Sequence, residues 1–246
     1  MSSDRLQGQN PKLLDRDAHA RGFASGMPSE KSYVAFFDLD DTLIAKNSGK
    51  IFWDYCFENN IYTPMELGYL GLSLFKFITG FDETEDFIRN WARCFKGWSE
   101  DRMHEITREL FDQRIRQVIR HRARDEINRH KSQGARTVIL SASTRFVCEP
   151  VKEHLSMDEV VCTALGIDDG KFTGTLASPY IFGEQKHLSA LSYCAENDID
   201  IQKCYYYGDA YTDRFVMEAV GNPVCVSPDR KLRAYAEQRN WPVVEW

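Results

Sequence analysis

Two patterns of apolar residues run along the chain. After Gly134, short apolar runs alternate with stretches in which apolar residues recur about every three to four positions. The short runs predict buried strands, and the recurring spacing predicts amphipathic helices. Strands that alternate with helices are typical of parallel sheets with right-handed crossovers. The sequence therefore predicts an α/β fold with a Rossmann-like parallel sheet.

The individual elements follow from these patterns. Asp168-Asp169-Gly170-Lys171 has the composition of a hairpin turn between two short strands. The other predicted strands cover residues 33–37, 137–140, 160–162, 204–207 and 223–226. The predicted helices cover residues 146–155, 186–196, 212–220 and 231–238.

A long helical block separates the first strand from the second. Across residues 49–133, aromatic and aliphatic side chains recur at helical spacing, as in Phe87, Trp91 and Phe95. We interpret this block as an insertion into an α/β domain made of residues 32–48 and 134–246. Residues 1–31 are rich in small and polar residues, and we expect them to form a mobile tail.

The most apolar part of the insertion spans residues 67–81. It is shorter than a membrane span requires, and Lys76 interrupts it. We expect a helix buried in a small bundle, without membrane contact. A membrane-surface contact or a face between two copies of the chain is the alternative.

Composition narrows the class of protein. A chain of 246 residues can hold one large domain with a smaller insertion, and its net charge of −6 argues against nucleic acid as a partner. The seven cysteines form no C-x-x-C pair and are expected to be reduced core residues. No apolar stretch follows the first charges, so we expect no secretory signal and a cytoplasmic protein. The oligomeric state is not predicted.

The first strand ends in a group of acids. Asp38, Asp40 and Asp41 follow the apolar run, and Thr42 comes next. Carboxylates this close repel one another unless a cation neutralises them, and Mg²⁺ is bound through one or two carboxylates together with water and phosphate. An acidic turn without a ligand is the alternative. An EF-hand loop is disfavoured, because Leu43 stands where that loop needs glycine.

Other predicted strands also end near polar residues. Ser141 follows the second strand, while Asp209 and Asp213 follow a later one. Parallel strands bring their carboxyl ends to one edge of the sheet, so we expect these side chains to converge. Lys186 falls at a predicted helix start, where the helix dipole and the ammonium group both favour an anion.

Four short motifs resemble those of a known family. FDLDDTL at 37–43, LSAS at 140–143, GEQK at 183–186 and YGDAYTD at 207–213 resemble the four ordered motifs of the haloacid dehalogenase superfamily. The insertion resembles the helical cap of its subfamily IB hydrolases, which include phosphoserine phosphatases. The resemblance extends from about Tyr33 to the C-terminus.

The resemblance implies roles for the acidic residues. Asp38 would be the nucleophile that forms an aspartyl-phosphate intermediate. Asp40 would protonate the leaving alcohol and then deprotonate the attacking water. Mg²⁺ would be held by the Asp38 carboxylate, the Asp40 backbone carbonyl and Asp209, while Asp213 would orient metal-bound water. Lys186 would neutralise charge on Asp38 and on the transferring group.

The resemblance also implies a substrate-binding set. Ser141 and nearby backbone N–H groups, including that of Ala142, would bind phosphoryl oxygens together with Lys186. Thr42 would hydrogen-bond phosphate or steady the loop. Asn47 stands where phosphoserine phosphatases resemble one another in placing a glutamate that receives the substrate amine, which weakens an assignment to phosphoserine. Asp41 falls at a position that varies in the family.

Purely structural roles are the alternative for several of these residues. Thr42 and Ser141 could cap turns or helices, Lys186 could be a surface lysine, and Asp213 could be an acid in a first helical turn. Ala210 and Tyr211 replace the small residues common in the fourth motif. The aromatic residues of the insertion should mostly form its core, although some could line a pocket for a ring or an alkylated amine.

The function that the resemblance implies is Mg²⁺-dependent hydrolysis of a small phosphorylated metabolite. The alternatives are a phosphotransferase on the same scaffold, a lipid-phosphate phosphatase that uses the 67–81 helix at a membrane surface, and a non-catalytic phosphate-binding module. The cap and the loop after the first motif would select the leaving group.

Overall fold

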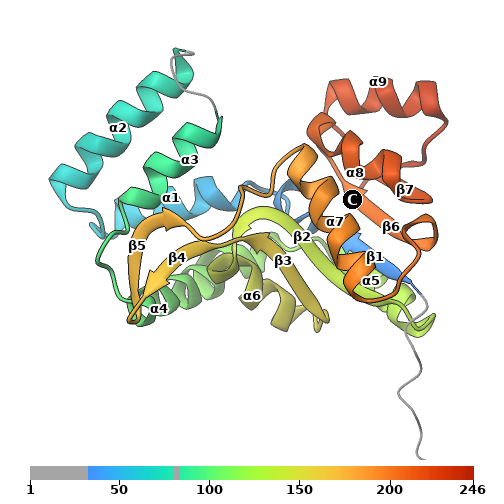
Figure 1. Ribbon diagram of the computed structural model, residues 1–246, viewed down its shortest axis with the longest axis horizontal. Helices are drawn as coiled ribbons and strands as arrows, with labels where there is room; N and C mark the ends of the chain where they lie inside the picture. The colour runs from blue at the N-terminus through green and yellow to red at the C-terminus, as the bar shows by residue number, and fades with distance from the viewer. Residues whose placement is uncertain (1–32, 80–83) are drawn as a thin grey trace, which may run out of the picture. The chain divides into compact units, whose positions relative to one another are not determined.

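A six-stranded parallel sheet forms the centre of the α/β domain. The computed structural model describes residues 33–79 and 84–246, so the expected tail lies outside the described residues. Within that part of the chain the strand order is β3-β2-β1-β6-β7-β8, and β1, β6 and β7 lie side by side (Figure 1). These strands are Val34–Phe37 (β1), Arg136–Thr144 (β2), Glu159–Thr163 (β3), Tyr205–Gly208 (β6), Asn222–Val226 (β7) and Val243–Val244 (β8). The predicted Rossmann-like parallel sheet is confirmed.

Strand β1 lies at the centre of the sheet and is buried on both faces. Phe36 packs in a cluster with residues of α7 (Glu184–Glu196), α8 (Arg214–Ala219) and α9 (Arg230–Arg239). Phe37 packs on the opposite face, with residues of α5 (His121–Ser132) and α6 (Arg145–His154). Phe37 is also level with Ile139 of β2 and Tyr207 of β6. The side chains that follow these three strands therefore emerge at one edge.

Some element boundaries differ from the predictions. Strand β2 continues past residue 140 to Thr144, with an irregular register between Ser141 and Thr144, so Ser141 lies inside the strand rather than after it. The helix predicted over 212–220 begins with a 3-10 turn before α8. Strand β8 was not predicted, because two valines are too short a run to give a pattern.

The insertion is helical, as predicted. It contains α1 (Ser48–Glu58), α2 (Pro64–Ile78), α3 (Thr84–Arg93) and α4 (Glu100–Leu110). The expectation that the most apolar helix is buried is wrong for much of α2, which exposes Leu72, Leu74 and Phe75. Among the described residues, no helix is long and apolar enough to cross a membrane. Helix α5 packs against β2 and buries Ala123 and Ile127. The division into domains itself stays a prediction.

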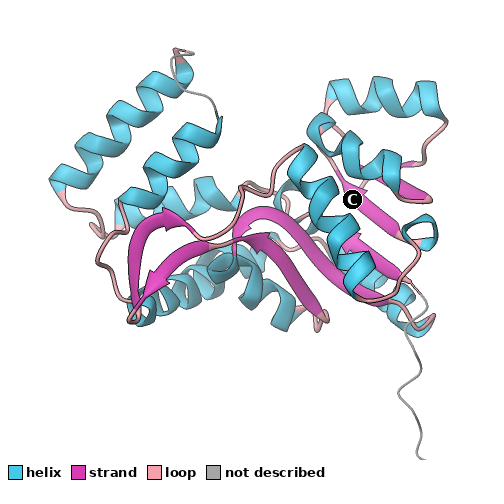
Figure 2. Ribbon diagram, in the orientation of Figure 1, coloured by secondary structure: helices cyan, strands magenta, loops and turns pink. Residues whose placement is uncertain are grey.

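A two-stranded hairpin packs against the insertion. Strands β4 (Leu165–Asp168) and β5 (Lys171–Leu176) pair antiparallel, apart from the main sheet (Figure 2). Asp169 and Gly170 both have positive φ, as a type I′ turn requires, so the hairpin prediction is confirmed. The backbone N–H of Gly97 donates to the carbonyl of Phe172, which ties the hairpin to the helices.

Candidate active site

The chain makes one irregular turn directly after β1. The backbone N–H of Asp38 donates to the Tyr207 carbonyl at 2.9 Å, which continues the pairing of β1 with β6. Asp38 Oδ1 then accepts from the backbone N–H of Leu39 at 2.7 Å. Asp40 is extended and Asp41 has a φ of 52°, so residues 39–43 do not form a regular helix. This turn leaves Asp38 Oδ2 available to other groups.

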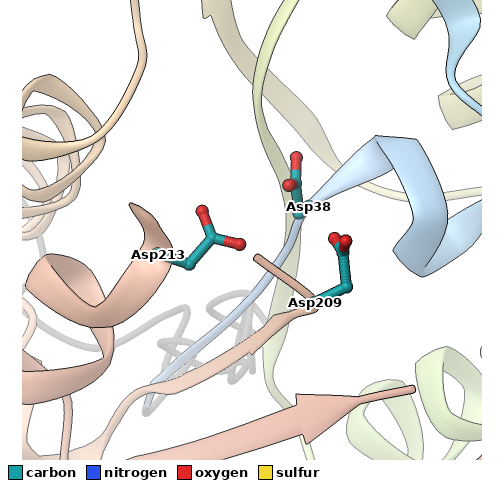
Figure 3. A group of neighbouring side chains, drawn as sticks. All are labelled: Asp38, Asp209 and Asp213. Atoms are coloured by element: carbon teal, nitrogen blue, oxygen red, sulfur yellow. The ribbon is translucent and has the colours of Figure 1, made fainter. Parts of the chain in front are cut away.

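Three carboxylates meet at this edge of the sheet. Asp38 follows β1, Asp209 follows β6, and Asp213 lies on the helical turn before α8 (Figure 3). One oxygen from each carboxylate lies within 4.8 Å of the other two. The convergence predicted for these acids therefore occurs.

Glycine at position 208 is required by this arrangement. A Cβ atom there would lie 2.5 Å from Asp213 Oδ2 and 2.7 Å from Tyr206 Cε1. Carbon atoms do not approach other heavy atoms so closely without a shift of the neighbour. The glycine therefore gives the Asp213 carboxylate its place beside β6.

Lys186 is the cation of the site and is almost fully buried. Its Nζ lies 2.7 Å from Asp38 Oδ2 and 2.8 Å from Asp213 Oδ1. It also donates to the Tyr206 hydroxyl at 3.1 Å. Burial opposes the charged form of Lys186, but Asp213 and Asp38 outweigh burial and raise the pKa of its ammonium group. The lysine is therefore a buried ion-pair partner and not a surface residue.

One lysine does not neutralise three acids. Burial, reinforced by Asp38 and Asp213, raises the pKa of Asp209 to about 8. Burial also raises the pKa of Asp38, against the opposing effect of Lys186. Clustered oxygen donors with excess negative charge suit a hard divalent cation such as Mg²⁺. The donor set thus fits the metal that the family implies.

Asp40 is held by the beginning of α1. Its Oδ1 accepts from the backbone N–H of Ser48 at 2.7 Å, and its Oδ2 accepts from Asn47 Nδ2 at 3.3 Å. Burial raises the pKa of Asp40, while the hydrogen bonds from Ser48 oppose that shift. The Asp40 side chain is not part of the group formed by the carboxylates of Asp38, Asp209 and Asp213.

Asn47, a predicted substrate contact, has structural partners on both sides of its amide. Its Oδ1 caps α1 by accepting from the backbone N–H of Lys50 at 2.9 Å. Its Nδ2 donates to Asp40, as described above. The residue therefore links the helix cap to the carboxylate of Asp40, and contact with substrate stays a prediction.

The remaining predicted residues lie around the same edge. Thr42 Oγ1 donates to Asp209 Oδ1 at 3.0 Å, so its hydroxyl steadies an acid of the cluster. Ser141 is buried, and its Oγ accepts from the backbone N–H of Ser143 at 3.1 Å. Ala142 between them is half-buried.

Two residues of the site were not identified from the sequence. Tyr206 was interpreted only as part of an apolar strand, yet its hydroxyl accepts from Lys186. Asp229 caps α9, accepts from the backbone N–H of Tyr211 at 2.8 Å, and donates its own N–H to the Asp209 carbonyl at 2.8 Å. Strand alternation places Tyr206 and Tyr207 on opposite faces, which was the available signal for Tyr206.

Comparisons with known proteins identify the family of the chain. The family model for haloacid dehalogenase-like hydrolases matches residues 35–218. A Streptomyces azureus protein named for inhibition of morphological differentiation is 33% identical over 217 residues, 87% of this chain and 78% of its own. A probable phosphatase of Mycobacterium tuberculosis is 30% identical over 216 residues, covering 87% of this chain and 75% of its own.

Solved structures share the fold. A protein of unknown function from Bordetella pertussis Tohama I aligns with a TM-score of 0.80 at 22% identity, covering 87% of this chain and 98% of that one. At this identity the likeness shows the fold alone. Together with the family match, these findings show that the chain belongs to the haloacid dehalogenase superfamily of hydrolases and is an enzyme of its phosphatase type.

Proposed function

We propose that the protein hydrolyses a small phosphate monoester through an aspartyl-phosphate formed on Asp38, with Mg²⁺ as cofactor. One observation carries the proposal. The Asp38 carboxylate stands at the end of the central strand, with one oxygen fixed by a backbone N–H and the other paired with a buried lysine. A carboxylate oriented in this way is a suitable nucleophile for phosphorus.

In the first half of the reaction, Asp38 Oδ2 attacks phosphorus and the bond to the leaving oxygen breaks. Lys186 offsets negative charge on Asp38 and on the phosphoryl oxygens during this transfer. The Ser141 hydroxyl and the N–H groups near Ala142 bind those oxygens. Orientation and charge stabilisation supply most of what phosphoryl transfer requires from a protein.

Asp40 acts first as the general acid and then as the general base. Its carboxylate is held by Ser48 and Asn47, and it is separate from the group formed by Asp38, Asp209 and Asp213. It donates a proton to the leaving alcohol and later accepts one from the water that attacks the aspartyl-phosphate. That attack breaks the bond between phosphorus and Asp38 and releases inorganic phosphate. Both steps use the same side chain in opposite protonation states.

Asp38 and Asp209, together with the backbone carbonyl of Asp40, would hold the Mg²⁺ ion, and Asp213 would orient its water. The bound ion would supply positive charge that lets an anionic carboxylate approach an anionic phosphate. Thr42 and Lys186 keep two of these acids in place through the contacts described above.

The direct test is the variant Asp38→Asn, assayed by phosphate release from a panel of phosphorylated metabolites with Mg²⁺. Turnover should be abolished, because an amide cannot form the aspartyl-phosphate. The matched control is Asp41→Asn, three residues away, exposed and in the left-handed conformation that asparagine tolerates. It should retain activity.

Robust turnover in a folded Asp38→Asn protein would contradict the mechanism. Adding a second alcohol to the wild-type reaction and analysing the products distinguishes hydrolysis from transfer. Inorganic phosphate as the sole phosphorylated product supports the hydrolase, whereas a new phosphate ester would establish the phosphotransferase alternative.

A further inference from the structure

A cavity of about 410 Å³ adjoins Asp40. Asp40, Ser48 and Ser143 border it on the side of the catalytic residues, and helices α1, α2 and α3 supply most of its remaining wall. Its volume lies within the range of small-molecule binding sites. Since Asp40 is the proposed proton donor to the leaving oxygen, this cavity adjoins the place where the leaving group must lie.

The wall contributed by the helices is apolar. Its side chains include Phe52 and Trp53 of α1, Leu70 and Leu74 of α2, and Ile88 and Trp91 of α3. Trp91 makes an edge contact with Phe52, with ring centroids 6.2 Å apart, so the aromatic part of the wall is packed together. The cavity is therefore built to surround an apolar group.

Charged side chains are scarce among the residues that line the cavity. They are Asp40, which has the proposed proton-transfer role, and Lys50. Lys50 pairs with Asp54 at 2.6 Å, and its side chain is 72% exposed. Within the described lining, no further acid receives an amine and no buried base receives a carboxylate.

This distribution of charge discriminates between leaving groups. A free ammonium or carboxylate group would lose its water on entering the cavity and find no buried partner, which is costly. An alkyl or aryl group would gain from leaving water, by about 0.8 kcal/mol per buried CH₂. The hydroxyls of Ser48 and Ser143, which lie 3.1 Å apart, add polar groups to the lining together with Asp40.

We propose that the substrate is a phosphate monoester of an uncharged apolar alcohol, whose alkyl or aryl part fills the cavity between α1, α2 and α3. This inference rests on the proposed function, since the phosphoryl group must lie at Asp38 for the leaving group to enter there. The lining explains why Asn47 can stand in place of a glutamate: no substrate amine needs a counter-charge.

The first test is a homologous series of n-alkyl phosphates, from ethyl to octyl, kept below their micelle concentrations, with phosphoserine and an aryl phosphate as separate arms. The value of kcat/KM should rise with chain length, by up to about fourfold per CH₂ from the transfer free energy above, until the cavity is filled. Phosphoserine should be the poorer substrate. A greater preference for the alkyl or the aryl arm identifies which kind of apolar alcohol the cavity takes.

The second test uses two leucines of the same helix. Leu74 lines the cavity, whereas Leu72 is 55% exposed and is not part of the wall. Leu74→Asp should lower kcat/KM for octyl phosphate at least tenfold and leave ethyl phosphate nearly unchanged. Leu72→Asp should change neither. Equal losses in both variants, or a loss that does not depend on chain length, would overturn the inference.

Binding of n-alkylphosphonates, followed by calorimetry, separates the failure of this inference from the failure of the proposed function. If no phosphate ester is hydrolysed but affinity still rises with chain length and falls in Leu74→Asp, the function is wrong and the cavity assignment stands. If esters are hydrolysed without any dependence on chain length, the function stands and the inference is wrong. A higher kcat/KM for phosphoserine than for the alkyl and aryl phosphates would also contradict the inference.

Discussion

The acidic cluster at the sheet edge is built from charged side chains, whereas the cavity beside the insertion helices is lined mainly by apolar ones. The cluster gathers Asp38, Asp209, Asp213 and Lys186 from separate elements of the core and holds them by ion pairs and hydrogen bonds. The cavity wall is formed chiefly by aromatic and aliphatic side chains of α1, α2 and α3. Fixed charges suit a phosphoryl group that is common to all substrates. An apolar wall suits contact with the leaving group, which differs from one substrate to another.

This difference predicts how substitutions should separate the two functions. A change in the cluster should reduce turnover of every phosphate ester. A change in the wall should reduce turnover only of those esters that reach it.

Apart from Asp38→Asn, which should abolish turnover, removal of the buried lysine should have the largest effect. Lys186→Met leaves Asp38 and Asp213 buried without their cation, and breaking a buried ion pair typically costs about 3–5 kcal/mol of stability. Loss of the charge at the reaction centre should lower kcat by on the order of 10²–10³ for all substrates. Chemical denaturation and steady-state kinetics measure the two effects, with the exposed Lys203→Met as the control. A variant as active as the control would refute the role of Lys186.

A methyl group added at a core glycine should lower kcat more than one added at a glycine of the insertion. Gly208→Ala puts a Cβ within 2.5 Å of Asp213 Oδ2, so the carboxylate must move. We expect kcat to fall by on the order of 10²-fold, since small misplacements at a catalytic site are this costly. Gly68→Ala, in α2 with no atom within 4 Å of the added carbon, should leave kcat unchanged and gain up to about 1 kcal/mol of helix stability.

If both glycine variants lose activity equally, the proposed independence of core and insertion is wrong. Thermal unfolding of the two variants provides the stability comparison. Retained activity in Gly208→Ala would show that Asp213 tolerates displacement.

Asn47 joins the two regions, and its replacement should have the smallest effect. Asn47→Ala removes the cap of α1, which typically costs about 1 kcal/mol, and removes one hydrogen bond to Asp40. If the residue positions Asp40, kcat should fall about tenfold while KM changes little for any leaving group. An increase in KM confined to amine-containing substrates would instead support the predicted substrate contact.

The sequence predicted the central strands and their acids because both signals are local. An apolar run that ends in Asp38 specifies a buried strand and a polar edge together, and Asp169-Gly170 specifies its turn without help from the rest of the chain. Parallel strands then bring Asp209 and the nearby Asp213 to the same edge as Asp38, so the convergence of these acids followed from the parallel direction of the strands.

The features that escaped prediction depend on contacts between distant elements. The hydroxyl of Tyr206 meets Lys186 only because α7 packs on one face of the sheet. The dual role of Asn47 requires the beginning of α1 to lie against Asp40. The cavity is lined by residues of several insertion helices and of the core, and the aromatic pattern of the insertion does not say which side chains fill its core and which line a space.

The most direct test of the account is to look for the phosphoryl group on Asp38. Wild-type enzyme with Mg²⁺ and a good phosphate monoester should be quenched in acid during turnover, digested, and analysed by peptide mass spectrometry. We expect a phosphorylated peptide whose modified residue is Asp38, formed and lost at rates that match turnover. Turnover without modification of Asp38, or with the phosphoryl group on another residue, would contradict it.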